Sequence, residues 1–247
     1  MANAETEQLT QAVRQLWKAR TAWNRSVQPM HWIGYGLILL ALIDLGEILI
    51  PPVLFNPNWE FQALGQIIER APVALIGFAF IFLGEKEERA RWELLLLPVF
   101  SWLLLLIGIA HLLLIPLGVA NTVRIDRQNV TQIETQANEL GQQIQQAKTE
   151  IAGISSQEDL EQLIAQLTAQ NAVPNIPDEQ SLPSLKDELL SSIEENEAVL
   201  SSQVQESIAS RRQSLLEKSF KWNLGALITG VIYLTMWRSS QWARTRK

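Results

Sequence analysis

The chain has 247 residues, of which 47% are hydrophobic, and its formal net charge is −6. All 18 aromatic residues lie within 1–120 or 220–247, and the 99 residues 121–219 carry 7 basic and 16 acidic side chains. A stretch of this kind cannot build an ordinary compact core, so we expect extended helix or disorder there. The absence of cysteine excludes disulfides and thiolate metal sites, and the negative charge argues against nucleic acid as a partner.

Residues 1–30 are predicted to form an amphipathic helix on the cytoplasmic side of a membrane. Leu9, Val13, Leu16 and Trp17 fall near one face of this helix, with basic side chains around it. Two interpretations remain open: a helix that lies flat on anionic lipid, and a solvated helix that packs on its own neighbours.

Four apolar segments predict four transmembrane helices, in residues 31–50, 71–84, 94–119 and 220–237. Residues 31–120 thus hold three spans with short loops, and 220–247 hold the fourth span and a basic tail. The second segment has 14 residues and would cover about 21 Å, so it crosses a ~30 Å hydrocarbon layer only if its helix begins near Phe61. Basic residues before span one, between spans two and three, and after span four place both termini in the cytoplasm.

Residues 121–219, between spans three and four, are predicted to form an acidic coiled-coil stalk outside the cytoplasm. Spacings of three and four, typical of a coiled-coil seam, relate Val130, Ile133, Ala137, Leu140, Ile144, Ala147, Ile151 and Ile154. Ser155-x-x-Glu158 is typical of a capping box that opens a second helix. A proline-rich stretch then precedes a third helix from Ser184. An antiparallel hairpin of one chain and a helical bundle between chains both satisfy this pattern.

The predicted fold is therefore an all-α membrane protein with four transmembrane helices and a long helical coiled-coil insert between spans three and four. The motifs of metal binding, phosphate binding and nucleophilic catalysis are missing from the sequence, which has two histidines, His31 and His111. We predict no enzyme activity, no catalytic residue, no cofactor and no metal site.

Ionisable residues inside the predicted spans form one candidate site. Asp44 and Glu47 are three residues apart and share one helix face, while Arg70 and His111 belong to spans two and three. Charged groups are costly inside a membrane and usually face each other or a water-filled cavity. We predict an intramembrane polar cluster of these four residues. Three interpretations remain open. The cluster conducts protons or holds a polar ligand, it is an ion-paired clasp between helices, or its carboxylates simply reach the membrane interface.

The fourth predicted span carries a helix-packing pattern. Ala226 and Gly230 have small-xxx-small spacing, and Gly225 lies alongside them. Because small side chains let another helix approach closely, we predict a helix contact at these three residues.

A local motif joins the first two spans. Ile50-Pro51 ends span one, Asn56-Pro57-Asn58-Trp59 forms a short loop, and Gln66-Ile67-Ile68-Glu69-Arg70 begins span two. The motif resembles the HpsJ-like membrane proteins of cyanobacteria, and the resemblance in architecture extends over roughly residues 28–240. In this interfacial motif we single out Asn56, Pro57, Trp59 and Glu69, since proline stiffens a turn and tryptophan anchors it at the membrane surface.

The resemblance implies a role near extracellular polysaccharide secretion. We predict a non-enzymatic membrane scaffold or accessory subunit whose stalk recruits other membrane or envelope proteins, with membrane lipid and further copies of the chain as other partners. Two alternatives remain: a proton- or ion-coupled transporter-like subunit that uses the polar cluster, and an accessory subunit of a thylakoid complex. We expect the plasma membrane rather than the thylakoid.

Overall fold

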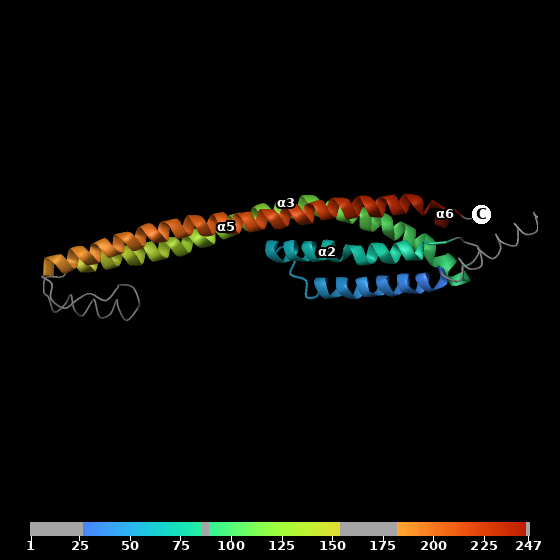
Figure 1. Cartoon of the computed structure of the whole chain (residues 1–247), viewed down its shortest axis with the longest axis horizontal. Helices are drawn as coiled ribbons and strands as arrows, with labels where there is room; N and C mark the ends of the chain where they lie inside the picture. Colours follow the sequence, from blue (N-terminus) through green and yellow to red (C-terminus); the bar gives the residue numbers. More distant parts are fainter. Residues whose placement is uncertain (1–26, 85–88, 154–181, 246–247) are drawn as a thin grey trace, which may run out of the picture. The chain divides into compact units, whose positions relative to one another are not determined.

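The computed structural model describes residues 27–84, 89–153 and 182–245 (Figure 1). These ranges are helical with short connections and contain no strand, so the prediction of an all-α chain is confirmed for them. The helices are Val27–Leu49, α2 (Pro57–Ile81), α3 (Arg91–Gly153), α5 (Leu182–Ser239) and α6 (Gln241–Arg244). Residues 1–26 of the predicted N-terminal helix, and the predicted capping box at Ser155 and Glu158, lie outside the described residues.

Three helices of the described ranges are long and apolar enough to cross a membrane: Val27–Leu49, α2 and α3. This finding is consistent with an integral membrane protein. The second span has 25 residues because α2 begins at Pro57, well before the apolar stretch that starts at Ala71. The fourth predicted span, in the last part of α5, is not among these three helices and stays a prediction.

The chain divides into two units. Residues 1–123 together with 217–247 form the first unit, which we call the bundle, and residues 124–216 form the second, which we call the helical pair. Both α3 and α5 contribute residues to each unit.

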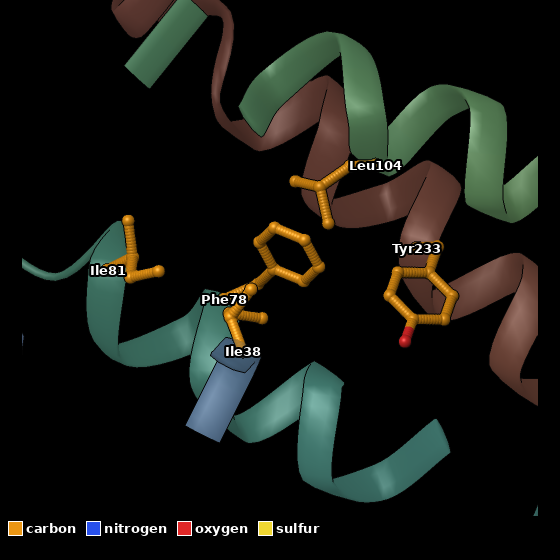
Figure 2. Close-up of a cluster of buried hydrophobic side chains, with 5 residues drawn as sticks. All are labelled: Ile38, Phe78, Ile81, Leu104 and Tyr233. Carbon is orange, nitrogen blue, oxygen red and sulfur yellow. The ribbon is translucent and has the colours of Figure 1, made fainter. Parts of the chain in front are cut away.

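The bundle has a buried apolar core to which four helices contribute. Ile38, Phe78, Ile81, Leu104 and Tyr233 form its main cluster, with Phe78 of α2 facing Leu104 of α3 (Figure 2). The rings of Phe78 and Tyr233 meet edge to face, with their centroids 6.3 Å apart. A second cluster joins Leu64 and Ile68 of α2 to Ala226 of α5. The core thus ties the helix Val27–Leu49 to α2, α3 and α5.

The helix Val27–Leu49 lies beside α2 in Figure 1, and two glycines bring their backbones together. A Cβ atom added to Gly34 would lie 2.8 Å from the carbonyl oxygen of Gly77, and one added to Gly77 would lie 3.2 Å from that of Gly34. Side chains larger than hydrogen would push the helices apart here. Close backbone approach through small residues is the usual way that membrane helices pack.

The helical pair consists of the later part of α3 and the earlier part of α5, which run antiparallel (Figure 1). Arg212 donates to both carboxylate oxygens of Asp126, at 2.9 and 3.0 Å, and Lys148 donates to Glu197 at 2.6 Å. Within the pair, residues early in the α3 part therefore meet residues late in the α5 part, and the reverse. The buried apolar side chains of the pair are Ile125, Ile133, Ile151, Leu189, Ile193 and Leu215.

The predicted seam between Val130 and Ile151 follows the less exposed side of α3, with one exception. Leu140 is 45% exposed, whereas the other seam residues in this range are buried or half-buried. A Cβ atom added to the neighbouring Gly141 would meet nothing within 4 Å, so a side chain at this position would not contact the rest of the pair. The coiled-coil geometry of the seam stays a prediction.

Candidate functional site

The interfacial motif begins α2. The side-chain oxygen of Asn56 accepts hydrogen bonds from the backbone N–H groups of Asn58 and Trp59, at 3.0 and 3.3 Å. Pro57 occupies the first turn, where its missing N–H has no cost. Pro57 and Trp59 therefore lie in the first turn of a helix rather than in the loop that the sequence predicts, because an Asn cap followed by proline is a helix start.

Arg70 of α2 meets both carboxylates of the helix Val27–Leu49. Its Nη1 atom lies 3.2 Å from Asp44 Oδ1 and 3.2 Å from Glu47 Oε2. The two carboxylates can share one guanidinium because their three-residue spacing puts them on one helix face. The structure thus brings three of the four predicted cluster residues together, as a clasp between two helices.

Glu69, the neighbour of Arg70 in the sequence, points to another helix. Its Oε1 atom accepts hydrogen bonds from Lys221 Nζ at 2.6 Å and from the indole N–H of Trp222 at 3.0 Å. Adjacent residues on a helix differ in height by about 1.5 Å along its axis. The contacts of Glu69 and of Arg70 therefore hold α2 to two different helices at nearly the same height. We call the charged residues at this level, Asp44, Glu47, Glu69, Arg70 and Lys221, the polar belt.

The predicted helix-packing residues of α5 contact α2 and α3 of the same chain. A Cβ atom added to Gly225 would lie 2.6 Å from Ile68 Cγ2 of α2, and one added to Gly230 would lie 3.0 Å from Leu112 Cδ2 of α3. Ala226 is fully buried beside them. In this structure, the three small residues let α5 sit against two helices at once.

His111 is not part of the clasp. Its Nδ1 atom lies 2.9 Å from the carbonyl oxygen of Ile107, four residues earlier in α3, and its ring lies 5.2 Å from that of Tyr233. The Nε2 atom is buried and has no hydrogen-bond partner among the residues that the structure describes. His111 instead lines a cavity of about 290 Å³, which Asp44 and Arg70 also line.

Sequence reasoning missed a second charged cluster, near the last residues of α2. Arg89 donates to the carbonyl oxygens of Ile81 and Leu83, at 2.7 and 2.6 Å. His31 Nε2 also donates to Leu83, at 2.8 Å, while its Nδ1 lies 3.4 Å from the carboxylate of Glu93. Burial lowers the pKa of Arg89, and the Glu93 carboxylate opposes this shift. Arg89 is one of the basic residues between spans two and three that predict the topology, and no sequence pattern shows that it caps a helix end.

Two hydroxyl contacts were also missed, one between α3 and α5 and one between α3 and Ser240, which precedes α6. Thr122 donates to Ser219 at 2.7 Å. The hydroxyls of Ser101 and Ser240 are 2.7 Å apart, and Arg244 donates to Ser101 at 2.8 Å. Serine and threonine are too common in this sequence for such pairs to be found without the structure.

These contacts hold helices of the bundle together and surround one cavity. Within residues 27–84, 89–153 and 182–245, no three side chains of the metal-binding kind gather at one place. The cavity wall combines many aliphatic side chains with Asp44, Arg70, His111 and Tyr233, a composition typical of sites for small apolar molecules.

The family model described as HpsJ-like protein matches residues 25–241, which is 217 of the 247 residues. The chain belongs to the HpsJ-like family. Neither curated proteins nor solved structures yield a match. The region that matches the HpsJ-like model includes the interfacial motif, the polar belt, the cavity and the whole helical pair.

Proposed function

We propose that this HpsJ-like chain is a non-enzymatic scaffold or accessory subunit of a polysaccharide secretion assembly. In this proposal, four spans fix the chain in the plasma membrane with both termini in the cytoplasm, and the coiled-coil helical pair recruits other envelope proteins. The family name supports the link to polysaccharide secretion. The observation that carries the recruiting role is the surface of the helical pair.

The helical pair leaves apolar side chains exposed halfway along it. The contacts Asp126–Arg212 and Lys148–Glu197 set a register that puts Leu140 and Val199 at about the same height on facing helices. Both side chains are 45% exposed, and Gly141 has open space above it. We call Leu140, Gly141 and Val199 the mid-pair patch. A partner helix could bury these side chains in the way that coiled-coil helices bury a seam.

The polar belt supports a clasp better than a proton or ion pathway. Arg70 lies within 3.2 Å of both carboxylates, so the charges compensate each other across two helices. His111, the group best suited to exchange protons near neutral pH, hydrogen-bonds within its own helix instead. We therefore keep the scaffold as the proposed function.

The test is a pull-down of the tagged full-length protein in mild detergent, with partners identified by mass spectrometry. The variant Leu140→Glu/Val199→Glu puts two charges on the mid-pair patch. The matched control Gln143→Glu/Gln203→Glu adds the same charge at exposed positions of the same two helices. We expect the patch variant to lose polysaccharide-export proteins that the wild type and the control retain.

Two results would contradict the proposal. If the wild type captures no secretion component, the scaffold role is wrong. If the patch variant and its control retain the same partners at the same yield, recruitment does not use the mid-pair patch. Far-UV circular dichroism should give the same helicity for all three proteins, since all four changed side chains are exposed.

A further inference from the structure

Charge is unevenly distributed along the helical pair. All four arginines of its described residues lie in 124–130 and 208–216, where Asp126 is the one acidic residue. The other described residues of the pair, 131–153 and 182–207, carry nine acidic side chains and two lysines. We call 124–130 and 208–216 the basic end, because these residues are nearest in the chain to the bundle and their net charge is +3. A helical pair that is acidic in total therefore has one basic end.

Two arginines of the basic end are not neutralised by the chain. Arg212 donates to both carboxylate oxygens of Asp126, at 2.9 and 3.0 Å, and so occupies the one carboxylate of this end. The side chains of Arg127 and Arg211 are exposed and have no ion pair or hydrogen bond to the residues that the structure describes. Both follow the Asp126–Arg212 pair by one residue on antiparallel helices, so they lie at the same height. A guanidinium presents a planar fork of N–H donors that matches phosphate oxygens.

The basic end lies close to the membrane along the chain. Arg124 and Arg127 follow Val119, the last residue of the predicted third span, by five and eight residues of α3, or about 8 and 12 Å at helical rise. The head-group layer extends about 5–8 Å beyond the hydrocarbon. Side chains on a helix lean toward its N-terminus, and for α3 this is the direction of the span, so both guanidiniums reach back toward the head groups. Glu217 and Lys218, which come next in α5, cancel each other in charge.

This position favours an anionic lipid over other anionic partners. A second copy in the same membrane brings its own basic end to this level, while its acidic side chains lie farther along the pair, so the two copies repel each other here. A dissolved phosphate or an acidic polymer has no anchor at this level. The bilayer holds the head group of an anionic phospholipid there, and a tethered ligand binds at a high effective concentration.

We propose that the basic end of the helical pair binds the phosphate groups of anionic phospholipids through the guanidinium groups of Arg127 and Arg211. The acidic side chains elsewhere on the pair repel the same lipids, which restricts the binding to this end. The proposal does not depend on the scaffold function, because it uses no residue of the mid-pair patch.

The test uses the full-length protein in nanodiscs of phosphatidylcholine. Parallel samples contain a trace of photoreactive phosphatidylglycerol, which is anionic, or of photoreactive phosphatidylcholine, which is zwitterionic, with the same diazirine near the head group. Mass spectrometry measures how strongly each lipid labels the basic end. At about 0.1 M salt we expect phosphatidylglycerol to label it about fivefold more, the factor that one arginine near the surface supplies. At about 1 M salt, where the Debye length falls to about 3 Å, the two lipids should label equally.

A variant and a matched control assign the preference to the two arginines. Arg127→Gln/Arg211→Gln removes two charges from exposed and unpaired positions, so the fold should stay the same and the two lipids should label equally. Gln143→Glu/Gln203→Glu lowers the net charge by the same amount outside the basic end and should keep the preference of the wild type. An excess of dissolved glycerol phosphate should not reduce the labelling by phosphatidylglycerol.

The proposal is overturned if both lipids label the basic end of the wild type equally at low salt, a comparison that needs no variant to fold. It is also overturned if Arg127→Gln/Arg211→Gln keeps the same preference as its control. Loss of the preference on addition of glycerol phosphate or polyglutamate, but not of sodium chloride at equal ionic strength, would mean that this end binds dissolved anions instead of lipid.

Discussion

Replacing Arg70 with methionine removes the cation that Asp44 and Glu47 share while it keeps a long apolar side chain in place. Each N–O distance is 3.2 Å, which corresponds to an attraction of about 5 kcal/mol per pair at an effective dielectric constant of 20. Most of this attraction is offset by the cost of bringing charges out of water. The net contribution of an ion pair to the free energy of unfolding is about 0–1 kcal/mol when the pair is exposed. Removing one partner of a buried pair costs about 3–5 kcal/mol.

The exposure of the three side chains decides where the clasp falls between these limits. Arg70 and Asp44 are 36% and 39% exposed, whereas Glu47 is 72% exposed. The pair with Glu47 therefore belongs near the lower limit and the pair with Asp44 between the two. We expect Arg70→Met to lower the free energy of unfolding by about 2–3 kcal/mol in total, with Asp44 as the larger contributor.

The assay is reversible unfolding in mixed micelles by titration with sodium dodecyl sulfate, followed by circular dichroism. In a background of Asp44→Asn/Glu47→Gln, the cost of Arg70→Met should shrink, because no carboxylate is left unpaired. Arg212→Met, which removes the Asp126 pair of the other unit, should leave the transition of the bundle unchanged. A cost below about 0.5 kcal/mol for Arg70→Met, or an equal cost in both backgrounds, would refute the clasp.

Two further substitutions test the contacts that place α2. Asn56→Ala removes the helix cap and should cost about 1 kcal/mol, with faster hydrogen exchange at the Trp59 amide as the local readout; unchanged exchange would mean that the cap is not formed. Gly65→Ala puts a Cβ atom 2.4 Å from the Trp222 ring and should cost about 1–3 kcal/mol, seen as altered tryptophan fluorescence. Its control Gly46→Ala meets nothing within 4 Å and should not destabilise; equal effects at the two glycines would contradict the packing.

Local patterns in the sequence predict much of the helical structure. The Asn56–Pro57 pair is a helix start that depends only on neighbouring residues, and the spacing of Asp44 and Glu47 places both on one face without knowledge of the fold. The same holds for the seam of α3, whose buried positions follow the predicted spacings of three and four. Leu140 departs from this pattern, since it is 45% exposed although its spacing predicts a buried position; periodicity does not show how closely the facing helix packs.

Contacts between distant residues could not be predicted in this way. Glu69 and Lys221 are 152 residues apart in the chain, and either of two neighbouring residues on α2 could have faced α5. The interfacial motif includes Glu69 but names no partner for it, and the polar-cluster hypothesis includes Arg70 instead. The polar-cluster hypothesis includes His111 because it is ionisable. In the structure, His111 Nδ1 hydrogen-bonds to the carbonyl oxygen of Ile107, within its own helix. Which side chain faces a neighbouring helix depends on how the helix is rotated about its own axis. That rotation is set by the packing of the whole bundle.

The polar belt has a consequence for the membrane around the protein. On the helix Val27–Leu49, the charged cluster at His31 and the clasp at Asp44 are 13 residues apart, or about 20 Å at helical rise. The hydrocarbon layer of a bilayer is about 30 Å thick, so this face of the bundle is about 10 Å too short for it. We expect the surrounding lipid to thin, at a cost of a fraction of a kcal/mol for each ångström of mismatch. Copies that share one thinned region would lower this cost, so mismatch alone favours their clustering and their accumulation in thinner membranes.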